Sequence, residues 1–178
     1  EGWEEYEWRW ESESLLPFKR DFIQPFWDGS PLGDTTILLH AEQGFGDAIQ
    51  FIRYADTIAN SKVNIIVECQ PELVTLFETM DSIKQVIPRG ESLPDYDVHA
   101  PLLSLPRLLK TDLDSIPNQV PYLSPATPET TMILDDPSKL KIGLVWAADS
   151  DSEVENWLMF ASASRSIELL DFATLFDF

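Results

Sequence analysis

Gly44 and Gly46 precede Asp47 in the segment GFGD, which places a carboxylate behind two glycines. The apolar run at 35–41 predicts a buried strand before this segment, and the pattern after it predicts a helix over about 47–60. Ligands of open α/β sheets bind beyond the carboxyl ends of the strands, where such loops lead into helices. The glycines would let the backbone turn tightly and approach a ligand, and the N–H groups that open a helix favour an anion. Asp47 has two interpretations, a functional carboxylate or simply the N-cap of the helix, and the residue type alone favours the cap.

Two histidines are predicted at the same edge of the sheet. His40 ends the first predicted strand, and His99 lies at the end of another, over 95–100. Because the carboxyl ends of parallel strands share one edge, the two rings are expected to converge. They could orient a phosphate or an acceptor, or be satisfied within the structure. Gln43 is a candidate polar contact in the same loop, and no metal site is predicted because the histidines lack further ligands.

The cofactor motifs in the sequence are incomplete. The glycine pair lacks the third glycine of the dinucleotide-binding fingerprint, and no Gly-Lys-Ser/Thr phosphate loop is present. Glu68 follows Gly46 by about 22 residues, a spacing that leaves a nicotinamide cofactor open as a weak alternative. We therefore expect no cofactor.

Strands and helices alternate along the middle of the chain. Predicted strands cover 35–41, 63–69, 84–88 and 95–100, and predicted helices cover 47–60, 70–80 and 102–109. This alternation predicts an α/β fold with a Rossmann-like parallel sheet, doubly wound and covered on both faces.

Four parts are predicted along the chain. They are a helix over 1–12, a connector over 13–34, the α/β domain with its linker over 35–137, and the start of a second α/β domain over 138–178. Aromatic residues recur at helical spacing in the first part and need a partner surface (Trp3, Tyr6 and Trp10). Other aromatic residues are expected to pin the connector to the body (Phe22, Phe26 and Trp27). A strand over 139–148 and a helix over 166–176 are predicted in the last part.

Charge and composition exclude several classes of partner. The chain has 31 acidic and 12 basic residues, for a net charge of -19. Nucleic acid and anionic lipid are poor partners for such a field. Cys69 is the only cysteine, which excludes an intrachain disulfide and a cysteine-based metal cluster. Neither a signal peptide nor an apolar run of about 18 residues is found, so we expect a cytoplasmic protein without a transmembrane segment.

The longest recognisable pattern is ILLHAEQGFGDAIQFIRYA, followed by IIVECQPEL and VIPRGESLPDYDVHAPLLSLPRLL. It resembles the glycosyltransferase module that follows tetratricopeptide repeats in many bacterial proteins. That module is similar to glycosyltransferase family 9, the ADP-heptose:lipopolysaccharide heptosyltransferases. The leading GWEEYEWRW resembles the last helix of such a repeat array, and FWDGSPL resembles the bridge to the module. The resemblance covers nearly all of the chain from Glu1 to Leu144.

The resemblance implies two facing Rossmann-like domains of the glycosyltransferase B type. The first domain would bind a hydroxyl acceptor and the second a nucleotide sugar. This chain would hold only the beginning of the second domain. Asp47 matches the position proposed as general base, which would take the proton of the attacking hydroxyl. Arg165 and Ser166 match the end of a loop in the second domain. The expected substrate-binding residues are then His40, Gln43, Gly44, Gly46, His99, Arg165 and Ser166.

A noncatalytic binding or scaffold module is the alternative from a different class. Carboxylates stand where a diphosphate would need cations (Asp149, Asp151, Glu153 and Glu155). In that case the aromatic N-terminal part would recruit a protein partner through Trp3, Trp8 and Trp10.

Overall fold

The computed structural model describes residues 2–13, 19–59, 62–125, 138, 143–146 and 166–176. The chain divides into two compact units, Glu1–Glu129 and Thr130–Phe178. All strands of the described residues lie in the first unit.

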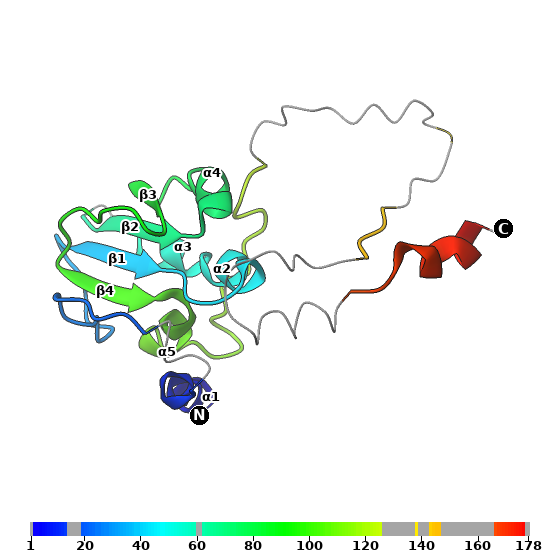
Figure 1. Cartoon of the computed structure of the whole chain (residues 1–178). Coiled ribbons are helices and arrows are strands. Elements are labelled where there is room, and N and C mark those ends of the chain that lie inside the picture. Colours follow the sequence, from blue (N-terminus) through cyan, green and yellow to red (C-terminus); the bar gives the residue numbers. More distant parts are fainter. Residues whose placement is uncertain are drawn as a thin grey trace. The chain divides into compact units, whose positions relative to one another are not determined.

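A four-stranded parallel sheet forms the centre of the first unit (Figure 1). Its strands are β1 (Thr36–His40), β2 (Asn64–Cys69), β3 (Gln85–Pro88) and β4 (Val98–Pro101), in the spatial order β3-β2-β1-β4. The chain therefore moves outward from β1 to β3 and then returns to the other side of β1. Between β1 and β4 the direction of winding reverses, which is where ligands of parallel α/β sheets bind. The predicted α/β fold with a parallel sheet is confirmed at this level.

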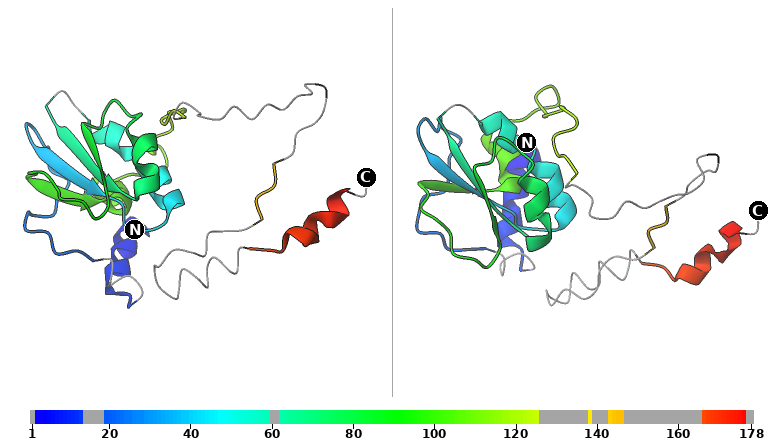
Figure 2. Two further views of the ribbon diagram at one scale, coloured as in Figure 1. Left: turned by 45° about the horizontal axis from the view of Figure 1, so that its top comes forward. Right: turned by 90° about the horizontal axis from the view of Figure 1, so that it is seen from above.

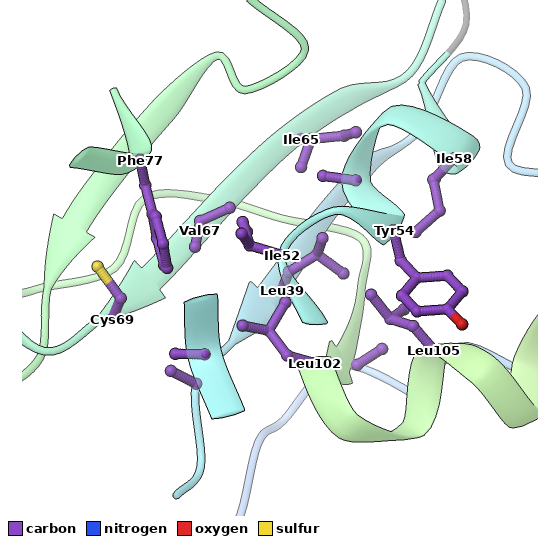
Figure 3. Packing of buried hydrophobic residues seen from close by; sticks show 14 of the residues in the cluster. Leu39, Ile52, Tyr54, Ile58, Ile65, Val67, Cys69, Phe77, Leu102 and Leu105 are labelled. Carbon is purple, nitrogen blue, oxygen red and sulfur yellow. The ribbon is translucent and has the colours of Figure 1, made fainter. Parts of the chain in front are cut away.

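The helices pack on one face of the sheet, as the right-hand view of Figure 2 shows. They are α2 (Phe45–Phe51), α3 (Tyr54–Ile58), η3 (Pro71–Leu73), α4 (Val74–Phe77), η4 (Leu102–Ser104) and α5 (Leu105–Leu108). The helices predicted over 47–60, 70–80 and 102–109 are thus each present as two shorter pieces, and the first begins at Phe45 rather than at Asp47. In the main core, strand residues such as Leu39 and Val67 pack with Phe77 of α4 and with Ile52, which follows α2 (Figure 3).

No helix of the described residues packs on the other face, so the prediction of a doubly wound sheet is wrong there. Leu38, Ile66 and Ile87 point to that face. They are covered by Phe22 of the connector and by Leu93 and Tyr96, which lie between β3 and β4. The β3–β4 connection spans only 89–97, and a crossover helix between parallel strands needs a dozen or more residues.

The connector is fixed along the outer edge of β4. Phe26 forms a parallel bridge with His99, whose carbonyl accepts a hydrogen bond from the Trp27 N–H at 2.8 Å. Trp27 is buried, as expected from its apolar ring. Gly29 follows with a φ of +88°, and a Cβ there would lie 2.5 Å from the Leu108 carbonyl oxygen. Only glycine fits this close approach between the connector and α5.

The N-terminal segment consists of α1 (Gly2–Tyr6) and the 3-10 helix η1 (Glu7–Glu11). Trp3 packs edge-on against Phe51 of α2, with ring centroids 6.2 Å apart, and α1 also contacts α5. The expected partner surface for the aromatic stripe is therefore the α/β body itself. Trp8, in contrast, is 69% exposed.

In the second unit, η5 (Leu169–Phe176) falls within the predicted helix over 166–176. The strand predicted over 139–148 is not formed at residues 143–146, and its remaining residues lie outside the described ones. None of the helices in the described ranges is long and apolar enough to cross a membrane.

Replacing a core leucine should lower the free energy of unfolding of the first unit far more than replacing an exposed leucine. We expect Leu39→Ala to lower the free energy of unfolding by about 2–5 kcal/mol, because Leu39 is fully buried between sheet and helices. Leu113→Ala is the control, because it shortens an equally large side chain that is 90% exposed. It should change the free energy of unfolding by less than about 0.5 kcal/mol. Urea unfolding followed by circular dichroism measures both, and equal losses would contradict the described core.

Candidate functional site

Asp47 lies in the first turn of α2, just beyond the carboxyl end of β1. The helix begins at Phe45 and Gly44 is its N-cap residue, so Asp47 is not the cap itself. Its Oδ2 accepts a hydrogen bond from the Gly44 N–H at 3.1 Å. This bond closes the turn between loop and helix and leaves the half-buried carboxylate at the ligand edge of the sheet.

The two glycines of this turn do not have the backbone conformation that requires glycine. Neither Gly44 nor Gly46 has a positive φ, so the expected tight glycine turn is not the reason for their presence. A Cβ on Gly46 would meet no atom within 4 Å, and one on Gly44 would meet only Asp47 Oδ2, at 3.4 Å. The glycines therefore leave open space over the loop.

Side chains from other segments hold the loop after β1. Gln43 donates from Nε2 to the Tyr6 hydroxyl at 3.0 Å, and its carbonyl accepts a hydrogen bond from Gln70 Nε2 at 2.6 Å. Arg89 donates from Nη2 to the carbonyl of Ala41. Gln43 thus lies in the predicted loop, but its amide group contacts the N-terminal segment.

His40 and His99 converge, as their predicted places on two parallel strands imply. His40 Nε2 and His99 Nδ1 lie 3.2 Å apart, within hydrogen-bond distance. Burial lowers the pKa of both rings, and the charge of Arg20 lowers each pKa further. Both rings are therefore neutral at pH 7, so that one nitrogen donates and the other accepts. Phe22 covers them, with its centroid 4.7 Å and 4.2 Å from theirs.

Two arginines gather near the histidines on the face that the helices leave open. Arg20 of the connector pairs with Glu68, which is the second-last residue of β2 and is almost completely buried. Arg89 follows β3, and its charge adds to the effects that lower the pKa of His40. Neither arginine stands out in the sequence pattern, although Arg89 and Glu68 both lie at or just beyond the end of a strand.

A buried ion pair joins the N-terminal segment to the loop, and the sequence pattern does not reveal it. Arg9 Nη2 donates to Glu42 Oε1 at 2.9 Å, and Arg9 Nε donates to Glu42 Oε2 at 3.3 Å. Arg9 Nη2 also donates to the hydroxyl of Ser104 at 2.8 Å, while Arg9 Nη1 donates to Glu7 at 2.9 Å. The Leu103 N–H completes the set by donating to Glu42 Oε1 at 3.2 Å. Glu42, which the network holds, is the residue before Gln43 in the loop after β1.

Burial dominates the protonation of Glu42. Removal of the carboxylate from water raises its pKa to about 7, while the charge and hydrogen bonds of Arg9 act in the opposite direction. In each of these hydrogen bonds the Glu42 oxygens are the acceptors. This arrangement suits the ionised carboxylate, which can only accept hydrogen bonds. The pair therefore stabilises this carboxylate most at pH values above 7.

The two remaining predicted residues lie outside the described part of the first unit. Arg165 lies outside the described residues, and Ser166 belongs to the second unit. Within the described ranges, no group of three or more His, Cys, Asp or Glu side chains is arranged to hold a metal ion. The described candidate residues thus form two groups, the loop with Asp47 and the histidine pair with the two arginines, and none of the described contacts joins Asp47 to the histidines.

Breaking the ion pair between Arg9 and Glu42 should lower the free energy of unfolding more at high pH than at low pH. Arg9→Met leaves the Glu42 carboxylate buried without its partner, so we expect a loss of about 3–5 kcal/mol in the free energy of unfolding at pH 8. Because the folded-state pKa of Glu42 is raised, the folded protein binds more protons than the unfolded chain between about pH 4.5 and 7. At pH 5 Glu42 is neutral in the folded state, and the loss should be smaller.

Arg107→Met is the matched control, because Arg107 is partly exposed and pairs with Glu7 at 3.6 Å. It should cost less than about 1 kcal/mol at both pH values. Urea unfolding of each variant and of the unchanged protein, at pH 8 and at pH 5, measures these changes in the free energy of unfolding. Equal losses for both variants, or an Arg9→Met loss that does not fall between pH 8 and pH 5, would contradict the described network.

Comparisons with known proteins do not assign the chain to a family. No protein-family model, no curated protein and no solved structure matches the chain. A fold class hosts many unrelated activities, so function has to be argued from the site itself.

Proposed function

We propose that the first unit is the acceptor-side domain of a two-domain, Rossmann-like glycosyltransferase similar to the heptosyltransferases. In this proposal a nucleotide sugar is the donor and a hydroxyl group is the acceptor. The N-terminal segment would be the last helix of a tetratricopeptide-like array. The observation that carries the proposal is the position of Asp47 at the carboxyl end of β1, beside the reversal of strand order.

Three features of the site support such a reaction. The Asp47 carboxylate is half-buried and uses Oδ2 for its bond from the Gly44 N–H, the single hydrogen bond to this side chain in the described part of the chain. The open space over Gly46 admits a substrate close to the backbone. The loop that carries both glycines is anchored by Gln70 and Arg89, so that Asp47 is held in place before substrate binds.

Asp47 would act as general base in this reaction. Its carboxylate takes the proton of the acceptor hydroxyl while the hydroxyl oxygen forms a bond to the anomeric carbon of the donor sugar. The bond from that carbon to the nucleoside diphosphate breaks, and the diphosphate leaves with the electron pair. Cations and N–H groups on the donor side would stabilise the leaving diphosphate.

The test is Asp47→Asn, which keeps an oxygen to accept the Gly44 N–H but removes the base. We expect nucleotide-sugar binding to persist and the transfer rate to fall about 100- to 10,000-fold. Asp56→Asn is the matched control, because Asp56 is an exposed acid in the first turn of α3 and should leave the rate unchanged. Calorimetry with a panel of nucleoside-diphosphate sugars measures binding, and release of nucleoside diphosphate measures transfer.

The titrations use this chain and, where the natural protein is longer, the natural protein. If neither binds any nucleotide sugar, the transferase proposal is wrong and the noncatalytic binding module replaces it. If transfer occurs but Asp47→Asn and Asp56→Asn behave alike, the assignment of Asp47 as the base is wrong.

A further inference from the structure

Arg89 carries a positive charge without a carboxylate partner of its own. In the described part of the chain it takes part in no salt bridge, although acidic residues outnumber basic ones by 31 to 12. The one hydrogen bond of its guanidinium group there is the donation from Nη2 to the Ala41 carbonyl. Arg89 is half-buried, and this partial removal from water lowers the pKa of its guanidinium group. A desolvated charge is costly unless an opposite charge compensates it.

Arg20 adds a second guanidinium group at the same place. Glu68 is its direct partner, and Glu68 is also the carboxylate whose charge acts on Arg89. Two arginines therefore share one buried carboxylate. These three groups together carry one net positive charge, in a chain whose net charge is -19.

The backbone arrangement places both arginines at the carboxyl ends of β1 and β2. Arg20 reaches the last residues of β2 from the connector. Arg89 starts beyond β3, at the edge of the sheet, and crosses the end of β2 to contact Ala41 just after β1. Both lie with the histidine pair on the face that has no helix among the described residues, and the Arg20 side chain is 40% exposed.

We propose that Arg20 and Arg89 together bind a carboxylate or phosphate group at the carboxyl ends of β1 and β2. A planar guanidinium group matches the oxygens of both anions and can donate two parallel hydrogen bonds. Glu68 orients Arg20, and the bond to Ala41 orients Arg89, so that the remaining N–H groups are available to the anion. The proposal does not rest on the transferase reaction, because it concerns binding to this unit alone.

Direct binding of small anions to the whole chain tests the proposal. Inorganic phosphate and acetate are titrated separately at constant ionic strength, with chloride as the balancing anion. We expect a saturable rise in the midpoint of thermal unfolding, because a ligand that binds only the folded state stabilises it. Phosphate alone, acetate alone or both can give this response, and the difference identifies which anion the arginines prefer.

The histidine rings supply a second readout in the unchanged protein. The chain has 2 histidines, so their ring protons can be followed by NMR. Because the charge of Arg20 contributes to the lowered pKa of His99, a bound anion should raise that pKa toward its ordinary value. A purely structural role for the arginines would leave the His99 titration unchanged by phosphate or acetate.

Arg89→Gln removes the charge but keeps a side-chain donor for the Ala41 carbonyl. It should raise the half-saturating anion concentration about tenfold or more. Arg53→Gln is the matched control, since Arg53 also donates to main-chain carbonyls, of Gln50 at 2.9 Å and Pro117 at 3.2 Å, but lies at the start of α3. It should leave anion binding unchanged.

Two results would overturn the proposal. One is the absence of a saturable response and of any His99 shift in the unchanged protein. The other is an unchanged response in Arg89→Gln with its fold intact. If Arg89→Gln does not fold, the His99 titration of the unchanged protein decides alone.

Discussion

The loop that follows β1 is held by contacts from segments distant in the sequence, and the geometry of the candidate site depends on them. Arg9 binds Glu42, and Tyr6 accepts a hydrogen bond from Gln43. Gln70 and Arg89 bind the backbone carbonyls of the same loop from the ends of β2 and β3. A loop with free carbonyls would be mobile, whereas these contacts fix the entry into α2 and therefore the place of Asp47.

The asymmetric covering of the sheet follows from one short connection. Because the chain between β3 and β4 is too short for a crossover helix, irregular segments cover the second face instead. Such segments bring polar side chains as well as apolar ones, which is how Arg20 and Arg89 come to lie on the same face as Phe22 and the histidines of β1 and β4. A helical layer there would have required an apolar surface in their place.

The strands and the meeting of the histidines were predictable, because both depend on local pattern. Runs of apolar residues mark β1 and β2, and the ends of parallel strands must share an edge, which brings His40 to His99. The pairing of Arg9 with Glu42 was not predictable, since it joins positions 33 residues apart that follow no periodicity. The interruption of the helix at Ile52–Arg53 was missed because the apolar spacing continues through it and both residues keep helical φ and ψ angles.

The contacts of Arg9 also set an order of events during synthesis. Arg9 leaves the ribosome before the rest of the unit, but its partner hydroxyl on Ser104 is 95 positions later. The α/β unit closes only when α5 has been made, because contacts between distant positions require the intervening chain. Until then Arg9 lacks the Ser104 hydroxyl, so the full set of contacts that holds the N-terminal segment forms only after the chain has been translated through α5.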